Sequence, residues 1–121
     1  MGVIYSYSTI TKCKICPDGF RIPTKTEWEE LIKYLGGKEL AGKRLLKRGD
    51  SGFDAEMGGR IDSYGSVLAG SLGFWWSTDI RSDIPTQYRK VYNFEISSIG
   101  KVRLIGQDSR VGNYVRCVQV N

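Results

Sequence analysis

The string CPDGFRIPT, residues 16–24, lies near the start of this chain of 121 residues and leads directly into an apolar-periodic segment that begins at Glu27 and Trp28. A second string, YVRCV, residues 114–118, lies close to the other end. Together they indicate a chain whose beginning and end are brought together. The stretch between them is suited to the display of a surface rather than to chemistry.

The segment after the first string predicts a helix. Thr24 can accept a hydrogen bond from the backbone of Glu27 while the Glu27 side chain reaches back, which is a capping box. Apolar residues then recur at helical spacing and form one stripe, namely Trp28, Leu31, Ile32 and Leu35. Gly36-Gly37 ends the helix, because glycine accepts the left-handed conformation that follows a helix terminus.

The C-terminal half is strand-like. An aromatic strand is expected at 74–78, and alternating apolar residues predict strands at 92–96 and 102–104, joined by a turn at 97–100. We expect a first strand within residues 1–12 and a last strand at 115–120, and we expect these two to pair. The glycine-rich stretch 49–73 has little pattern and is expected to be ordered but irregular.

This order of elements is an α+β pattern within a single domain, residues 1–121. Because the later strands alternate apolar and polar residues, one sheet face should pack while the other stays free. The residues expected to be largely buried are Trp28, Leu31, Leu35, Trp75, Trp76 and Phe94.

Composition limits the possible partners. Hydrophobic residues make up 40% of the chain, which fits a folded globular domain. No apolar run approaches the roughly 20 residues that cross a bilayer, and the N-terminus has no signal-like region, so no membrane span is expected. The net charge is +5, with a basic cluster at Lys38, Lys43, Arg44, Lys47 and Arg48. No nucleic-acid motif accompanies this cluster, so it is interpreted as solvated surface and nucleic acid is not an expected partner.

Few residues are suited to catalysis or metal binding. The chain has no histidine, which removes the commonest general base and transition-metal ligand. Cys13 and Cys16 form a CxxC, which leaves two alternatives open, half of a zinc site or a redox pair. Neither is favoured, because Cys117 would be only a third zinc ligand and the following Pro17-Asp18-Gly19 indicates a turn rather than a helix. The acidic residues of the middle stretch lack calcium-loop spacing. We expect no metal and no cofactor.

Several strings together resemble the Fibrobacter succinogenes major paralogous domain family. Its members begin with a CPxGWRLPTxxEW-like string and end with a VRCV-like string, which correspond here to residues 16–28 and 115–118. The strings AGK, GFDA, GGR and WWST, at residues 41–43, 52–55, 58–60 and 75–78, also fit in order and spacing. Phe20 and Ile22 replace the usual Trp and Leu and keep the apolar character.

The resemblance implies a C-type-lectin-like fold, in the branch that includes formylglycine-generating enzymes. Such domains are usually found on bacterial surfaces, and similar ones are the variable proteins of diversity-generating retroelements. The resemblance also places Cys16 beside Cys117, which implies a disulfide in an oxidising compartment and leaves Cys13 free. It does not extend to chemistry, because neither the reactive cysteine pair of those enzymes nor the EPN- or QPD-like triplet of calcium-dependent lectins is present.

We therefore expect a non-catalytic ligand-binding or display domain, possessing neither enzymatic activity nor a metal, on a cell surface, secreted or on a virion, with a cytoplasmic location not excluded. Its partner would be a protein or glycan on another surface. Candidate ligand-binding residues are polar side chains between 77 and 113 that suit adaptable recognition, namely Asp79, Arg81, Asp83, Gln87, Tyr88, Arg89, Tyr92, Asn93, Gln107, Asp108 and Arg110. The alternatives are a structural subunit of an adhesin or pilus, and an enzyme related to formylglycine-generating enzymes.

Overall fold

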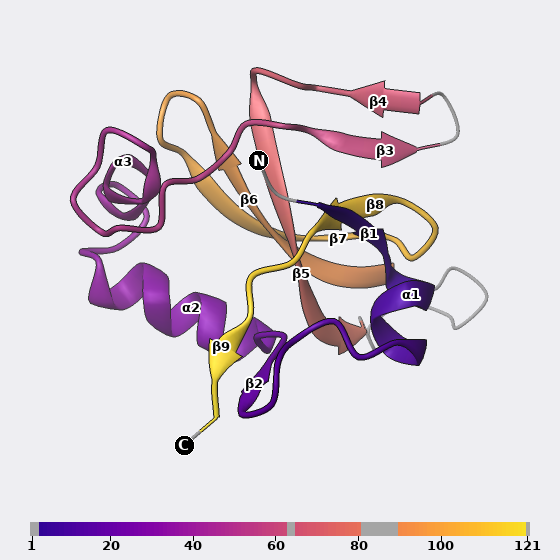
Figure 1. Cartoon of the computed structure of the whole chain (residues 1–121). Helices are drawn as coiled ribbons and strands as arrows, with labels where there is room; N and C mark the ends of the chain where they lie inside the picture. Colours follow the sequence, from indigo (N-terminus) through magenta and orange to yellow (C-terminus); the bar gives the residue numbers. More distant parts are fainter. Residues whose placement is uncertain (1–2, 63–64, 81–89, 121) are drawn as a thin grey trace.

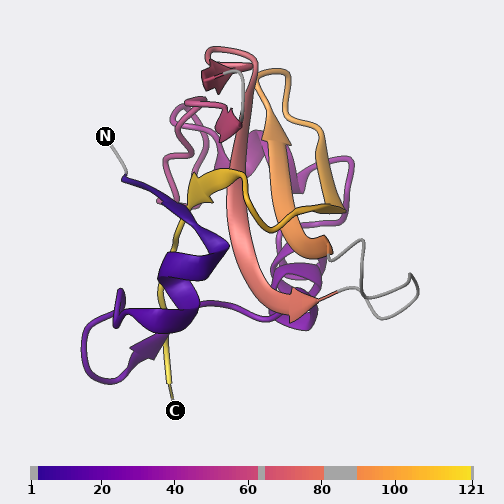
Figure 2. The same cartoon turned by 90° about the vertical axis from the view of Figure 1, so that its right-hand side faces the viewer.

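The protein is an α+β domain with a strongly curved sheet (Figures 1 and 2). The helix at residues 25–34 packs on one face of the sheet, and the short helix at residues 7–12 packs on the other. The computed structural model describes residues 3–62, 65–80 and 90–120. The helices are α1 (Tyr7–Lys12), α2 (Lys25–Tyr34) and α3 (Ala41–Leu45). The strands are β1 (Ile4–Ser6), β2 (Phe20–Arg21), β3 (Arg60–Asp62), β4 (Gly65–Val67), β5 (Leu72–Ile80), β6 (Lys90–Ser97), β7 (Val102–Asp108), β8 (Gly112–Tyr114) and β9 (Val118–Gln119).

Helix α2 forms as the sequence predicts. Thr24 and Glu27 make the capping box, and Gly36 follows the helix with a φ of 102°. The amide of Gly37 then donates to the carbonyl of Ile32 at 2.9 Å. Because these signals are local, the sequence alone shows where the helix begins and ends.

The strands form two sheets. The main sheet has the order β4-β3-β8-β5-β6-β7, with β1 paired to β8, and a small second sheet pairs β2 with β9. The hairpin β6–β7 turns at residues 97–100, as expected, and the amide of Gly100 donates to the carbonyl of Ser97 at 2.9 Å. Strand β5 pairs antiparallel with β6 but parallel with β8, where Trp75 lies opposite Tyr114.

The ends of the chain differ in detail from expectation. Within residues 3–12, the strand is limited to Ile4–Ser6, because Ser6 caps α1 by accepting from the amide of Thr9. The expected last strand is reduced to Val118–Gln119. The prediction that the first and last strands pair is wrong, since β1 pairs with β8 and β9 pairs with β2. The start and end of the chain are nevertheless joined by these two strand pairs.

The sheet has a hydrophobic core on each face. On one face, α2 packs Trp28 against Phe94, with stacked rings 4.5 Å apart, and Trp75, Ile96 and Tyr114 belong to the same cluster. On the other face, Tyr7 of α1 packs on Trp76 at 5.6 Å. Of the residues expected to be buried, all are buried except Leu31, which is half-buried.

The two-sided core follows from the curl of the sheet. Strands β7 and β8 are separated by β6 and β5 in the sheet order, yet only residues 109–111 connect them. A connection this short requires the sheet to curl until β8 lies near the end of β7. The expected free polar face is therefore wrong for β6, in which Val91, Asn93 and Glu95 are buried on the face opposite Phe94.

Candidate functional site

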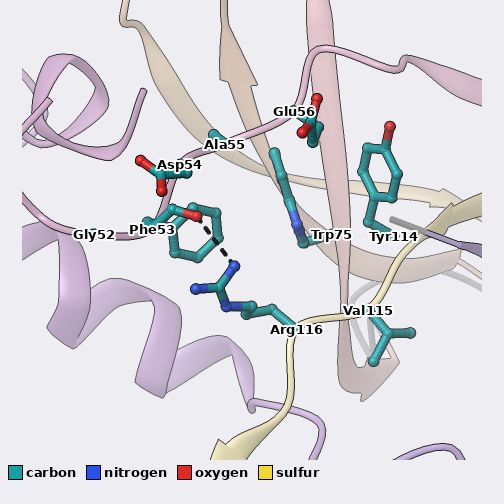
Figure 3. A pocket seen from close by; sticks show the side chains of 9 residues that line it. All are labelled: Gly52, Phe53, Asp54, Ala55, Glu56, Trp75, Tyr114, Val115 and Arg116. Atoms are coloured by element: carbon teal, nitrogen blue, oxygen red, sulfur yellow. Dashed lines mark hydrogen bonds between the residues drawn. The ribbon is translucent and has the colours of Figure 1, made fainter. Parts of the chain in front are cut away.

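A groove opens where the segment before β3 meets the end of β8 (Figure 3). We call it the Arg116 groove. It encloses about 300 Å³ and is lined by Gly52, Phe53, Asp54, Ala55, Glu56, Trp75, Tyr114, Val115 and Arg116. Most of these residues belong to the GFDA and VRCV strings, so two motifs at opposite ends of the chain form one surface feature.

The groove is held by backbone contacts on both sides. The amide of Ala55 donates to the carbonyl of Leu45 at 2.9 Å, which ties the segment 52–56 to the end of α3. On the other side, the parallel pairing of Trp75 with Tyr114 places these rings 5.5 Å apart. The lining is thus attached to regular elements and is largely formed before any ligand arrives.

Arg116 is positioned over an aromatic base. Its guanidinium lies 4.4 Å from the centre of the Phe53 ring, and its Nη1 donates to the Phe53 carbonyl at 3.1 Å. The Phe53 ring in turn meets Trp75 edge to face at 5.4 Å. A guanidinium has five N–H donors, so an exposed Arg116 retains donors for a ligand while its orientation is restrained.

Tyr114 lines both the groove and the hollow of about 460 Å³ described below, and its hydroxyl lies beside Gly58 (Figure 3). Burial raises the pKa of this phenol, and the nearby Glu56 carboxylate raises it further, so the hydroxyl keeps its proton at neutral pH. Gly58 permits this placement, because a Cβ at that position would lie 1.7 Å from the hydroxyl oxygen. Glu56 itself is paired with Lys47 at 2.9 Å.

Two further hollows extend the groove. One of about 460 Å³ shares Ala55, Glu56 and Tyr114 with it and continues towards α3. Another of about 480 Å³ shares Phe53 and Arg116 and runs along α2, past Trp28, Leu31 and Tyr34. Both hollows thus share lining residues with the Arg116 groove, and the three linings together contain apolar and charged side chains.

The disulfide lies beside this groove. Cys16 and Cys117 are bonded, with their Cα atoms 5.8 Å apart, and the exposed Cys13 is free. The pairing implied by the family resemblance is therefore confirmed. Because Arg116 precedes Cys117, the bond anchors the backbone that carries the guanidinium.

Only part of the predicted ligand-binding set falls within the described residues. Arg81, Asp83, Gln87, Tyr88 and Arg89 lie outside the described residues. The other six fall into three places: Asp79 and Tyr92 near the start of α2, Asn93 and Gln107 in the interior, and Asp108 and Arg110 at the end of β7.

Near α2, the described residues have structural contacts. Asp79 accepts a hydrogen bond from the amide of Lys25 at 3.1 Å, next to the helix N-terminus. The ammonium of Lys25 lies 5.0 Å from the centre of the Tyr92 ring. At the end of β7, Arg110 holds Asp108 in a two-point ion pair and lowers the pKa of that carboxyl to about 2.

Asn93 and Gln107 are buried and are not exposed to a ligand. The curl of the sheet encloses them, and Asn113 of β8 donates to the Gln107 side-chain oxygen at 3.2 Å. Sequence alternation placed these polar residues on a face that would be solvent-exposed only in a flatter sheet.

The groove residues Phe53, Glu56, Tyr114 and Arg116 were not predicted as a site. Phe53 and Arg116 belong to the GFDA and VRCV strings, which we interpreted as features of the fold, and Glu56 and Tyr114 directly adjoin these strings. No other pattern connects them, because spacing along the sequence cannot show that residues 53 and 116 meet.

The described residues contain no cluster of three or more metal-ligating side chains of the Cys, Asp or Glu type. Within the same residues, no helix is both long enough and apolar enough to span a bilayer.

The fold and site define an α+β domain closed by a disulfide, with a preformed groove at the junction of its ends. The Fibrobacter succinogenes major domain family matches residues 1–119, and the chain belongs to this family. No curated protein and no solved structure matches it. The C-type-lectin-like assignment therefore remains a prediction from the family resemblance.

Proposed function

We propose that this protein is a ligand-binding domain that captures a glycan or another macromolecule through the Arg116 groove without transforming it. The observation that carries the proposal is Arg116 itself, an exposed guanidinium restrained over Phe53 at the mouth of a preformed hollow. Sites that bind organic ligands combine apolar and aromatic side chains, here Phe53 and Trp75, with a few fixed polar groups.

The polar groups of the groove suit recognition. Arg116 donates, the Asp54 and Glu56 carboxylates accept, and the Tyr114 hydroxyl does both. Asp54 has a φ of 53°, an uncommon conformation for a residue other than glycine, and is exposed. Uncommon backbone conformations of this kind are found preferentially at ligand sites.

We further propose that the domain works outside the cytoplasm, on a cell surface, secreted or on a virion. The disulfide supports this location, because such bonds persist in oxidising compartments. A role as the variable protein of a diversity-generating retroelement is proposed from the family resemblance alone. Sequencing the gene across one population would test it through substitutions concentrated at exposed positions.

An array of neutral and acidic glycans, probed with the wild-type domain, tests the binding function. Arg116→Ala should abolish the signals, while Arg110→Ala, the matched control at the end of β7, should preserve them. The melting temperatures of both variants should stay close to that of the wild type. Mass spectrometry should recover each bound glycan unaltered.

A different pattern would contradict the proposal. If Arg110→Ala abolished binding and Arg116→Ala did not, the ligand would bind at the C-terminal surface predicted from the sequence. A glycan recovered in cleaved or modified form would show an enzyme instead.

A further inference from the structure

Several basic side chains lie on the side of the Arg116 groove that faces α3. Helix α3 and the β6–β7 turn meet by direct backbone contact, since a Cβ on Gly42 would lie 2.0 Å from the carbonyl oxygen of Gly100 (Figure 1). Arg48 reaches the same turn and donates to the carbonyl of Ser98 at 3.4 Å. Residues far apart in sequence thus bring Lys43, Arg48 and Lys101 to one side of the molecule.

The charges of these basic side chains are only partly neutralised. Arg44 pairs with Asp50 at 2.8 Å, and Lys47 pairs with Glu56 at 2.9 Å. Among the residues that the structure describes, Lys43, Arg48 and Lys101 have no carboxylate partner. We call these three residues the cationic edge. An unpaired group of like charges costs free energy through mutual repulsion, and a bound anion relieves it.

The hollow of about 460 Å³ connects this edge to the groove. Its lining includes Lys47, Arg48, Glu56 and Ser98, and it shares Tyr114 with the Arg116 groove. Its volume falls in the range of sites that take small organic groups, roughly 300–1,000 Å³. We call the cationic edge, this hollow and the Arg116 groove together the path; Glu56, whose carboxylate is paired with Lys47, lines both the hollow and the groove.

We propose that this path binds an acidic polysaccharide, with its anionic groups on the cationic edge and on Arg116. The inference rests on the proposed binding function and names the class of ligand. A carboxylate or sulfate would pair with Arg48 or Arg116 through two hydrogen bonds, as planar guanidinium groups favour. Ser98 and the Tyr114 hydroxyl would bind sugar hydroxyls between these anchors.

A glycan fits the path better than a nucleic acid. Proteins that bind single-stranded nucleic acid present ring faces on which bases stack. On the path, Trp75 and Tyr114 are each 4% exposed and Phe53 is half-buried beneath the Arg116 guanidinium, so these three rings leave little face for bases to stack on.

Matched probes test the inference. An oligomer of galacturonic acid and its fully methyl-esterified form share one backbone and differ only in charge. Isothermal titration calorimetry should show binding of the acid form and at least tenfold weaker binding of the ester. Binding of the acid form should weaken at higher salt, because exposed charges are screened.

Charge-reversal variants locate the surface. Lys43→Glu with Arg48→Glu should weaken binding of the acid oligomer at least tenfold. Lys12→Glu with Lys14→Glu is the matched control, because it makes the same change in net charge on exposed lysines of the N-terminal region. The control should change affinity by less than about twofold, since only a local effect is expected.

Several results would overturn the inference. Equal binding of the acid and ester forms would leave the groove as a glycan site but remove the acidic class. An equal loss in the control would show that net charge alone is responsible. A short DNA duplex that binds more tightly than the acid oligomer and displaces it would identify a nucleic-acid surface. No binding of the acid oligomer at millimolar concentration, with neutral glycans still captured on the array, would refute the ligand class while the proposed function stands.

Discussion

Removal of the disulfide should strongly destabilise the domain. The bond joins residues 101 apart in sequence, so it closes almost the whole chain. For a loop of this length the chain-entropy model gives about 4.7 kcal/mol of stabilisation at 25 °C, and measured losses for native disulfides are about 2–5 kcal/mol. We therefore expect Cys16→Ala with Cys117→Ala to lower the free energy of unfolding by about 2–5 kcal/mol. For a domain of this size, that corresponds to a fall in melting temperature of roughly 8–20 °C.

Guanidinium chloride denaturation, followed by tryptophan fluorescence, measures this loss. The m-value should rise, because the unfolded chain without the cross-link exposes more surface. Cys13→Ala is the matched control, since Cys13 is exposed and free, and it should change stability by less than about 0.5 kcal/mol. A double variant that lost less than about 1 kcal/mol, with an unchanged m-value, would refute the reasoning from loop closure.

Three further predictions concern local features. Gly42→Ala should destabilise the domain by about 1–3 kcal/mol in chemical denaturation, because the added Cβ would overlap the Gly100 carbonyl; a stability equal to wild type would contradict the contact. The pKa of Glu27 is lowered to about 2, mainly by its hydrogen bond with Arg21. The ionised Glu27 therefore stabilises the folded protein fully above its ordinary pKa of 4.5, and this stabilisation is lost as the pH falls towards 2. Glu27→Gln should remove this acid dependence and cost about 1 kcal/mol at pH 7, whereas Glu30→Gln on the same helix should leave both unchanged. Leu68 is exposed with a φ of 65°, so Leu68→Gly should stabilise by about 0.5 kcal/mol, and a measured loss would show that its contacts outweigh the strain.

Local signals made part of the fold predictable. Thr24, Glu27 and Gly36 determine the ends of α2 through contacts within a few residues, so the sequence shows them directly. The strands β6 and β7 follow from alternation and from the turn between them. The disulfide between Cys16 and Cys117 was accessible only through the family resemblance, because spacing alone left the cysteines open to other interpretations.

Long-range pairing was not predictable in the same way. The position of β8 between β3 and β5, parallel to β5, depends on how the sheet curls rather than on any local pattern. That curl buries Asn93 and Gln107, which alternation had placed on a free face. The groove depends on the same long-range arrangement, because Phe53 and Arg116 meet only after the two ends of the chain have come together.

The central claim is that a ligand binds at the Arg116 groove and the adjoining cationic edge. Titration of ¹⁵N-labelled protein with the galacturonic acid oligomer, followed by amide NMR, tests it most directly. We expect chemical-shift changes concentrated at Arg48, Ser98, Tyr114 and Arg116. Shifts confined to residues 108–110 at the end of β7, with those four amides unmoved at saturation, would contradict it.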